Sequence, residues 1–338
     1  MIGSISKVRP AGHHHYYKYA HARNHNDMNR IAASKSKTYC DGELTEEYRF
    51  YYPLASLTQT SSGMFGNSLI KIFDDNLSKV GWAEHMFTGS KLEKINIENY
   101  AATGAMTAVP GIQMKPEGKV DYKVKFYNAT VVTATFQQTY IRKGSNIQLY
   151  APKATNMSNI FSGYGGGGFE VMASSPNINI EIDCRNAVSA NSFGYYNPSI
   201  DELDFPIDED GNHTFGSGKP EVGRLYTTFP KLKQGKDMFY GSRLSRNYVL
   251  AILNDLPDWS NDTAIHEITL GIHVDNKYDP EVNIALKKCQ NNYVTPIEEY
   301  GASLPEEITT DKGWSLTVQW NGTATSSAYP PPPPSTDS

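Results

Sequence analysis

Apolar and polar residues alternate in many short segments of this chain, and a period of two predicts half-buried β-strands. In residues 91–100, for example, Ile95, Ile97 and Asn99 fall on one face. Polar stretches separate one such segment from the next. We expect strands at residues 47–56, 68–74, 91–100, 119–127, 130–143, 169–173, 177–183, 224–229, 248–254, 264–275 and 314–320.

A helical pattern stands out only at residues 74–86, where Asp74 or Asp75 can cap the N-terminus and Leu77 and Val80 begin an apolar face that Trp82 completes. Strands that follow one another with long polar loops between them favour antiparallel pairing over alternating strand–helix units. We therefore predict an all-β fold, an antiparallel sandwich or barrel with one short helix.

The loops and the two ends suggest how the chain is organised. Residues 184–223 and 276–313 are long polar loops, and loops of that length usually hold function or subunit contacts. We expect residues 1–40 to be a flexible arm, residues 41–322 to be one folded domain and residues 323–338 to be a proline-rich tail. Five prolines in that tail predict extended polyproline or disorder.

Charge is distributed unevenly along the 338 residues. The first 40 residues have a net charge of +6, whereas the whole chain has −5. A basic arm before an acidic body is typical of a protein that contacts a polyanion at one end, although a solvated tail explains it equally well. Tyr and His rings beside the cations could stack on bases. The candidate nucleic-acid contacts are Lys7, Arg9, Lys18, Arg23, Arg30, Lys35 and Lys37.

Three widely spaced cysteines, Cys40, Cys184 and Cys289, have no metal-ligand spacing and do not indicate a disulfide framework. No apolar run approaches the roughly 18 residues that span a bilayer. After Met1 and Ile2 the chain turns polar, which is unlike the core of a signal peptide.

Motifs for catalysis are weak. The glycine run at residues 163–168 fits G-x-G-x-x-G, but a strand follows it where a dinucleotide site needs a helix, so we interpret it as a flexible loop. His266 and His273 fall on opposite faces of one expected strand and cannot face a single pocket. We assign no catalytic residue and expect no enzymatic activity.

An acidic stretch at residues 201–213 is the one candidate for metal binding. Asp208, Asp210 and Asn212 have the spacing of the first donors of a calcium loop, but His213 and Lys219 replace its glycine and its glutamate. A solvated acidic turn is the favoured interpretation. A weakly bound calcium or magnesium ion between subunits is the alternative, and no cofactor is otherwise required. Its candidate ligands are Asp201, Asp204, Asp208 and Asp210.

The order of these elements resembles that of the jelly-roll capsid proteins of parvoviruses, particularly the short ones of invertebrate densoviruses. The likeness covers about residues 45–325 and consists of the basic arm, two strands, a helix ending near Gly81-Trp82, the strand KLEKINIENY and the late strand GWSLTVQWNGT. Two features depart from that family. The phospholipase motif H-D-x-x-Y is absent, since His25-Asn26-Asp27 breaks it, and the glycine run lies far from the N-terminus.

This resemblance implies an eight-stranded antiparallel jelly roll. It also implies a structural coat protein that assembles as a sixty-copy icosahedral shell, packages a single-stranded DNA genome and meets a host-cell receptor. The protein would then be found in the virion and, during assembly, in the host nucleus or cytoplasm. Two alternatives stay open: a carbohydrate-binding β-sandwich module and, with less support, a β-sandwich glycosidase, which needs two carboxylates facing one cleft.

Overall fold

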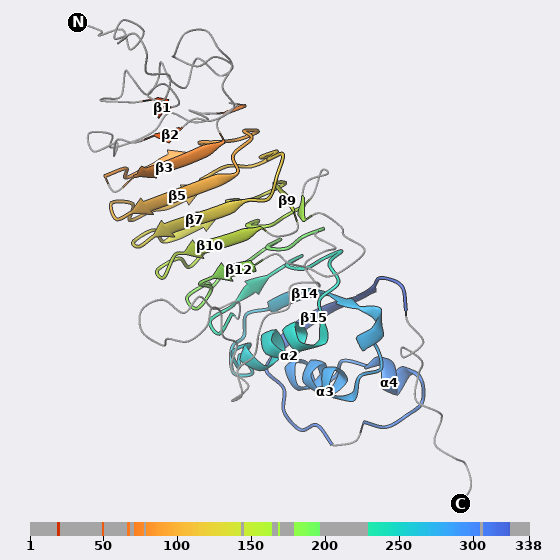
Figure 1. The fold of residues 1–338 in the computed structure, drawn as a ribbon. Helices are drawn as coiled ribbons and strands as arrows, with labels where there is room; N and C mark the ends of the chain where they lie inside the picture. Colours follow the sequence, from red (N-terminus) through yellow and green to blue (C-terminus); the bar gives the residue numbers. More distant parts are fainter. Residues whose placement is uncertain are drawn as a thin grey trace, which may run out of the picture.

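The computed structural model describes residues 19–20, 49–50, 66–67, 71–77, 79–142, 145–163, 168–169, 179–196, 229–304 and 307–324 (Figure 1). Its strands are β1 (Tyr19–Ala20), β2 (Arg49–Phe50), β3 (Ile72–Asn76), β4 (Ala83–Glu84), β5 (Lys94–Asn99), β6 (Ala105–Thr107), β7 (Asp121–Phe126), β8 (Val131–Thr133), β9 (Tyr140–Ile141), β10 (Asn146–Tyr150), β11 (Gly168–Phe169), β12 (Asn179–Ile182), β13 (Gln234–Gly235), β14 (His266–His273) and β15 (Trp314–Asn321). Its helices are α2 (Arg246–Asp255), α3 (Pro280–Cys289), α4 (Pro296–Glu299) and the 3₁₀ turn η4 (Val274–Asn276).

The described strands all pair in parallel, and successive passes of the chain stack on one another as a solenoid (Figure 1). The largest sheet has the order β12-β10-β7-β5-β3. Along it, partner residues lie 22, 27, 25 and 33 positions apart in the sequence. Each pass, which we call a coil, therefore buries its apolar face against its neighbours along the stack, as repeat proteins do.

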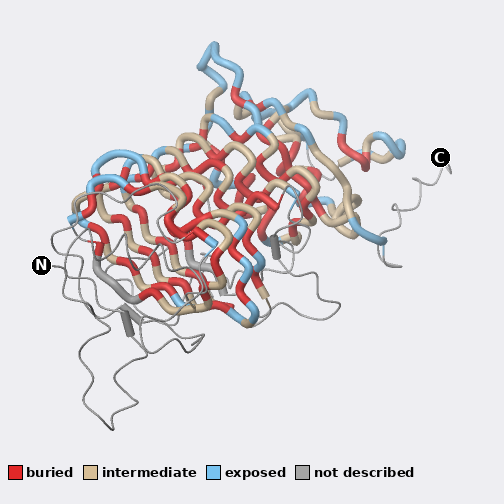
Figure 2. Tube along the Cα trace, turned by 90° about the horizontal axis from the view of Figure 1, so that it is seen from above, coloured by how far each residue is buried: buried red, intermediate tan, exposed pale blue. Residues whose placement is uncertain are grey.

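In the coils with described side chains, the inward positions of this first sheet are apolar except for the buried Asn99 of β5. Ile95 of β5 pairs with Tyr122 of β7, which pairs with Ile147 of β10, and all three are buried. Alternation therefore works as a strand signal here, with every second residue turned into the coil. Figure 2 shows buried stretches of successive coils lying side by side.

A second parallel ladder runs along another side of the coils. It starts as β4-β6-β8 and continues through single-residue bridges at Asn156 and Ser189 to β13, β14 and β15. Between the two ladders each coil turns a corner at a buried small residue. These corner alanines are Ala102, Ala129, Ala154 and Ala187.

After the second ladder, each coil bends through a residue with positive φ. The φ angles lie between 49° and 60° at His85, Ala108, Ala134, Asn159, Ser192 and Asp237. Such angles are uncommon outside glycine, and they recur because hydrogen bonds to the next coil fix the bend, as from Ala134 N to Ser158 O (3.0 Å). Inside the bends Phe161 lies between Phe136 and Phe193, with ring centroids 5.6 Å apart on each side.

Helices α2, α3 and α4 form a cap at residues 246–304, beside β14 and β15 (Figure 1). Helix α2 packs against α3 and β14, and α3 packs against β15. Asp279 caps α3 by accepting a hydrogen bond from Val282 N (3.0 Å), and Pro280 follows at the first helical position. Arg246 of α2 joins the two helices through Asp279 Oδ2 (2.7 Å).

The prediction of an antiparallel jelly roll is therefore wrong, because the described pairings are parallel and each crosses to the next coil. The expected helix at residues 74–86 is also wrong: that segment holds β3 and β4. The expected strand at residues 248–254 lies in helix α2. The apolar run YVLAILN fits a buried strand and a buried helix face equally well by its period, so it could not decide between them.

Other expectations are confirmed or corrected in part. Ile95, Ile97 and Asn99 do share the buried face of β5. Residues 130–143 are divided by a bend into β8 and β9, whereas residues 276–313 hold η4, α3 and α4 within the expected loop. No helix in the described ranges is long and apolar enough to cross a membrane.

Candidate binding surface

The outward face of the first sheet presents polar side chains in straight rows. Each of β5, β7 and β10 turns three residues outward, and the parallel register places equivalent ones side by side. All but Lys94 are half-buried. The three rows, taken from β5 to β10, are Lys94–Asp121–Asn146, Asn96–Lys123–Gln148 and Glu98–Lys125–Tyr150.

Contacts between neighbours hold these rows in place. Lys125 Nζ lies 2.9 Å from Glu98 Oε1, and Asn146 Nδ2 donates to Asp121 Oδ1 at 2.8 Å. Both links join adjacent coils rather than residues of one strand. The rows are therefore ordered before any partner arrives, which lowers the entropy lost on binding.

A tyrosine cluster borders the rows where the strands end. The rings of Tyr100 and Tyr127 stack with centroids 4.2 Å apart and an interplanar angle of 6°. Tyr150 meets Tyr127 edge-on at 5.5 Å. Burial first, and then the hydrogen bond with Tyr100, raise the pKa of Tyr127 above its ordinary value, so Tyr127 is uncharged at neutral pH.

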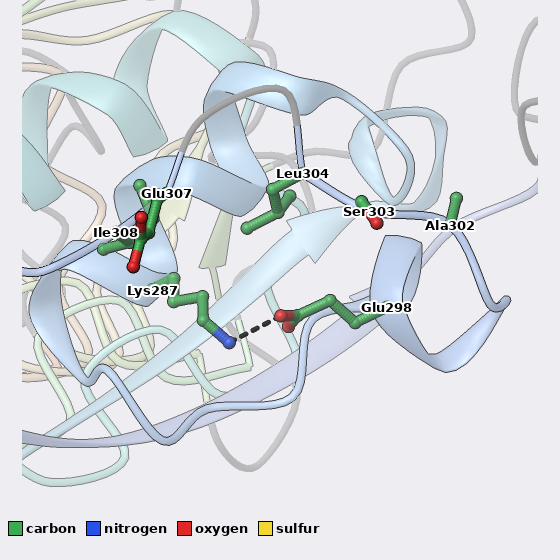
Figure 3. A pocket seen from close by; sticks show the side chains of 7 residues that line it. All are labelled: Lys287, Glu298, Ala302, Ser303, Leu304, Glu307 and Ile308. Carbon is green, nitrogen blue, oxygen red and sulfur yellow. Dashed lines mark hydrogen bonds and ion pairs between the residues drawn. The ribbon is translucent and has the colours of Figure 1, made fainter.

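A pocket of about 440 Å³ opens in the cap between α3, α4 and the segment that follows α4 (Figure 3). Across it Lys287 Nζ lies 2.6 Å from Glu298 Oε1. Glu298 also completes the capping box of α4, accepting from Thr295 N at 3.0 Å. Leu304 and Ile308 supply its apolar lining.

Lys287 and Glu298 neutralise each other within this pocket. Burial raises the pKa of Glu298, but hydrogen bonds from Lys287 and Thr295 outweigh burial and lower it. An ionised carboxylate that caps a helix and pairs with a lysine has a structural role. This arrangement holds α4 against α3 and presents no pair of groups poised for proton transfer.

His266 is a second buried polar group with a structural explanation. Its ring stacks on Trp259 with centroids 4.8 Å apart, and its Nε2 lies 3.2 Å from Asp262 Oδ2. A hydrogen bond from the Ala264 backbone first, and then His266, lower the pKa of Asp262. His273 lies on the other face of β14, as its place in the sequence predicts.

The site residues predicted from the sequence all lie outside the described residues. This holds for the metal candidates Asp201, Asp204, Asp208 and Asp210, and for the arm cations Lys7, Arg9, Lys18, Arg23, Arg30, Lys35 and Lys37. Of the arm, the structure describes β1, which pairs in parallel with β2. Within the described part of the chain, no three His, Cys, Asp or Glu residues gather as metal ligands.

The outward rows were missed by the sequence reasoning, although a signal for them exists. In the sequence, a segment of alternating inward and outward residues ends three residues before each corner alanine, and this pattern returns about once per coil.

A scan of protein-family models finds no match for this chain, and comparisons with curated proteins and with solved structures find none either.

Proposed function

We propose that this protein is a binding protein that holds a linear carbohydrate polymer against the outward face of its first sheet. The observation that carries the proposal is the set of in-register rows, which place amide, ammonium, carboxylate and hydroxyl groups side by side on adjacent coils. Sugar hydroxyls both donate and accept hydrogen bonds, so a mixed polar surface suits them.

Regular spacing supports a polymer rather than a small compact ligand. Parallel strands lie about 4.8 Å apart, so each row offers one polar group per coil at that interval, although the kind of group differs from coil to coil. A linear polymer also repeats its groups at a fixed interval. Many weak contacts then add up along one chain, as in multivalent binding. No chemical reaction is part of this proposal.

The coat-protein function stays a prediction, and its support is reduced. It depended on the resemblance to jelly-roll capsid proteins, and the described strands form a parallel solenoid instead. The rows on the sheet support the carbohydrate-binding alternative, on a solenoid rather than on a β-sandwich.

Binding of the full chain to immobilised linear polysaccharides, among them xylan, mannan and dextran, tests the proposal. The double variant Lys123→Ala/Gln148→Ala removes two neighbours of the middle row. We expect it to weaken binding of the recognised polymer about thirtyfold, since two lost hydrogen bonds contribute about 1 kcal/mol each.

A matched control, Lys115→Ala/Gln137→Ala, changes the same residue types away from these rows. It should bind as the unaltered chain does. Unaltered affinity in the Lys123→Ala/Gln148→Ala variant, or an equal loss in both variants, would contradict a site on this face.

A further inference from the structure

A basic corner runs along the solenoid between the first sheet and the second ladder. In each coil it consists of the few residues before the second ladder. The corner segments of four successive coils are residues 127–131, 150–156, 184–190 and 229–236, and their cations are Lys153, Arg185, Lys231, Lys233 and Lys236. Asp183 and Asp237 directly flank two of these segments, and the segments themselves contain no Asp or Glu, although acids outnumber cations in the whole chain by 36 to 31.

Hydrogen bonds show that these segments form one continuous column. Lys153 Nζ donates to Asn128 Oδ1 (2.7 Å), and Asn186 Nδ2 donates to Pro152 O (2.6 Å). Lys231 Nζ donates in turn to Asn186 Oδ1 (2.6 Å). Each link crosses to the preceding coil, so asparagine and lysine alternate along the axis of the stack.

Lys153 and Lys231 each donate to an amide oxygen, and within the described part of the chain neither forms an ion pair with a carboxylate. Both belong to exposed residues, as does Lys236. Other cations of the corner are partly engaged: Arg185 pairs with the buried Asp183, and Lys233 lies over the ring of Trp259 at 4.4 Å. Among the exposed lysines, Lys153 and Lys231 are the two whose side-chain hydrogen bonds place them in the column.

We propose that this column binds the acidic groups of a linear anionic polysaccharide. The inference rests on the proposed function and deepens it by naming the class of polymer. Lysines two coils apart, at about twice the 4.8 Å strand spacing, meet carboxylate or sulfate groups. The asparagine amides between them meet the hydroxyls of the intervening sugars.

A nucleic acid fits the corner less well. Single strands are held by stacking bases on ring faces, and the nearest rings, Tyr100 and Tyr127, already stack on each other. The guanidinium group binds phosphate with two parallel hydrogen bonds, and the one arginine of the corner already pairs with Asp183. The amides and threonine hydroxyls beside the lysines are the groups that sugars use.

The experiment measures binding of the full chain to heparin, polygalacturonate, neutral dextran and a single-stranded oligothymidylate, over a series of salt concentrations. Lys153→Glu/Lys231→Glu should weaken binding to an acidic polysaccharide about tenfold and flatten its salt dependence. Lys153→Arg/Lys231→Arg should bind as the unaltered chain does. The control Lys115→Glu/Lys119→Glu makes the same change in net charge on exposed residues elsewhere and should leave binding unchanged.

A second variant, Asn128→Asp/Asn186→Asp, keeps both lysines and places a carboxylate beside each. It should weaken binding to an acidic polysaccharide as Lys153→Glu/Lys231→Glu does. Three results would overturn the inference. They are an equal loss of affinity in the Lys115→Glu/Lys119→Glu control, tighter binding of the oligothymidylate than of either acidic polymer, and no loss of affinity in the corner variants. Binding of neutral polymers alone overturns the inference and leaves the proposed function standing, whereas binding of no polysaccharide overturns both.

Discussion

The coils at residues 71–196 and the helical cap both bury apolar side chains against partners that are distant in the sequence, but the two regions pack in different ways. In the coils, Phe161 packs against Phe136 and Phe193, one coil away on each side. In the cap, α3 buries Val282, Leu286 and Cys289 on one helix face and packs against α2 and β15. The coils therefore stack equivalent positions on one another, whereas each helix of the cap packs against elements of different kinds.

The same contrast appears in the polar contacts. Links such as Lys125–Glu98 join coils, so they repeat wherever a coil repeats. Contacts in the cap are single: the buried Asn283 donates to Lys277 O (2.9 Å) and Asp279 O (2.7 Å) and occurs once. A surface built from repeated links is suited to a repeating partner, and the cap closes one part of the apolar stack.

Phe161→Ala should have the largest effect on stability, because it opens a cavity between two coils. We expect a loss of about 3–5 kcal/mol in the free energy of unfolding. Urea unfolding followed by circular dichroism measures it. Phe161→Leu is the control and should cost much less, and a Phe161→Ala protein as stable as the unaltered chain would show that the coils do not depend on this stack.

The two buried cysteines report on the two regions separately. Burial raises the pKa of the Cys184 thiol in the coils, and burial raises that of Cys289 in the cap to about 12. In a Cys40→Ser background we expect neither to react with Ellman's reagent at pH 8. In mild urea, Cys289 should react about tenfold faster than Cys184, because we expect the cap to open while the stack of coils stays intact.

Mass spectrometry of the labelled peptides distinguishes these two sites. Full unfolding should make both thiols react at one rate, which is the control. Faster labelling of Cys184 would reverse the expected order and show that the coils open before the cap.

Acid should weaken the cap. The pKa of Glu298 is lowered in the folded protein from 4.5, so its stabilisation is complete above about pH 4.5 and is lost as pH falls through the lower, folded value. Thermal unfolding between pH 3 and pH 6 should show this loss. Glu298→Gln should flatten the dependence, and an unchanged pH profile in that variant would exclude Glu298 as its source.

Replacing alanine by glycine should change the free energy of unfolding in opposite directions in the two regions, and these are the smallest effects that we predict. Ala134 has φ 53°, so Ala134→Gly relieves strain and should stabilise by up to about 1 kcal/mol. Ala285 lies within α3, so Ala285→Gly should destabilise by about 1 kcal/mol or more. Chemical unfolding of both variants gives the comparison, and equal signs would contradict it.

The sequence predicted strands better than their arrangement. Alternation correctly identified the buried face of β5 because each strand buries one side whatever its pairing. It could not decide between parallel and antiparallel neighbours. The coil length also varies, with 22 to 33 residues between partners, which hides the repeat from inspection.

The candidate surface was harder to predict than the strands. Asn128, Lys153, Asn186 and Lys231 carry no shared motif and are separated by 25 to 45 positions. Only the register of the coils brings them together. The helix α3, by contrast, was open to prediction, since Asp279-Pro280 is a helix-start signal that the expected long loop overlooked.

The single-residue bridge between Ser189 and Gln234 joins neighbouring coils across 45 positions of sequence, whereas the bridge between Val131 and Asn156 spans 25. The ladders thus fix the cross-section of the stack although the sequence spacing between partners differs. Length follows a separate rule, because each added coil extends the stack by about 4.8 Å. Duplication of one coil would give a longer protein of the same cross-section, and its reach along a polymer could grow without redesign of a single contact.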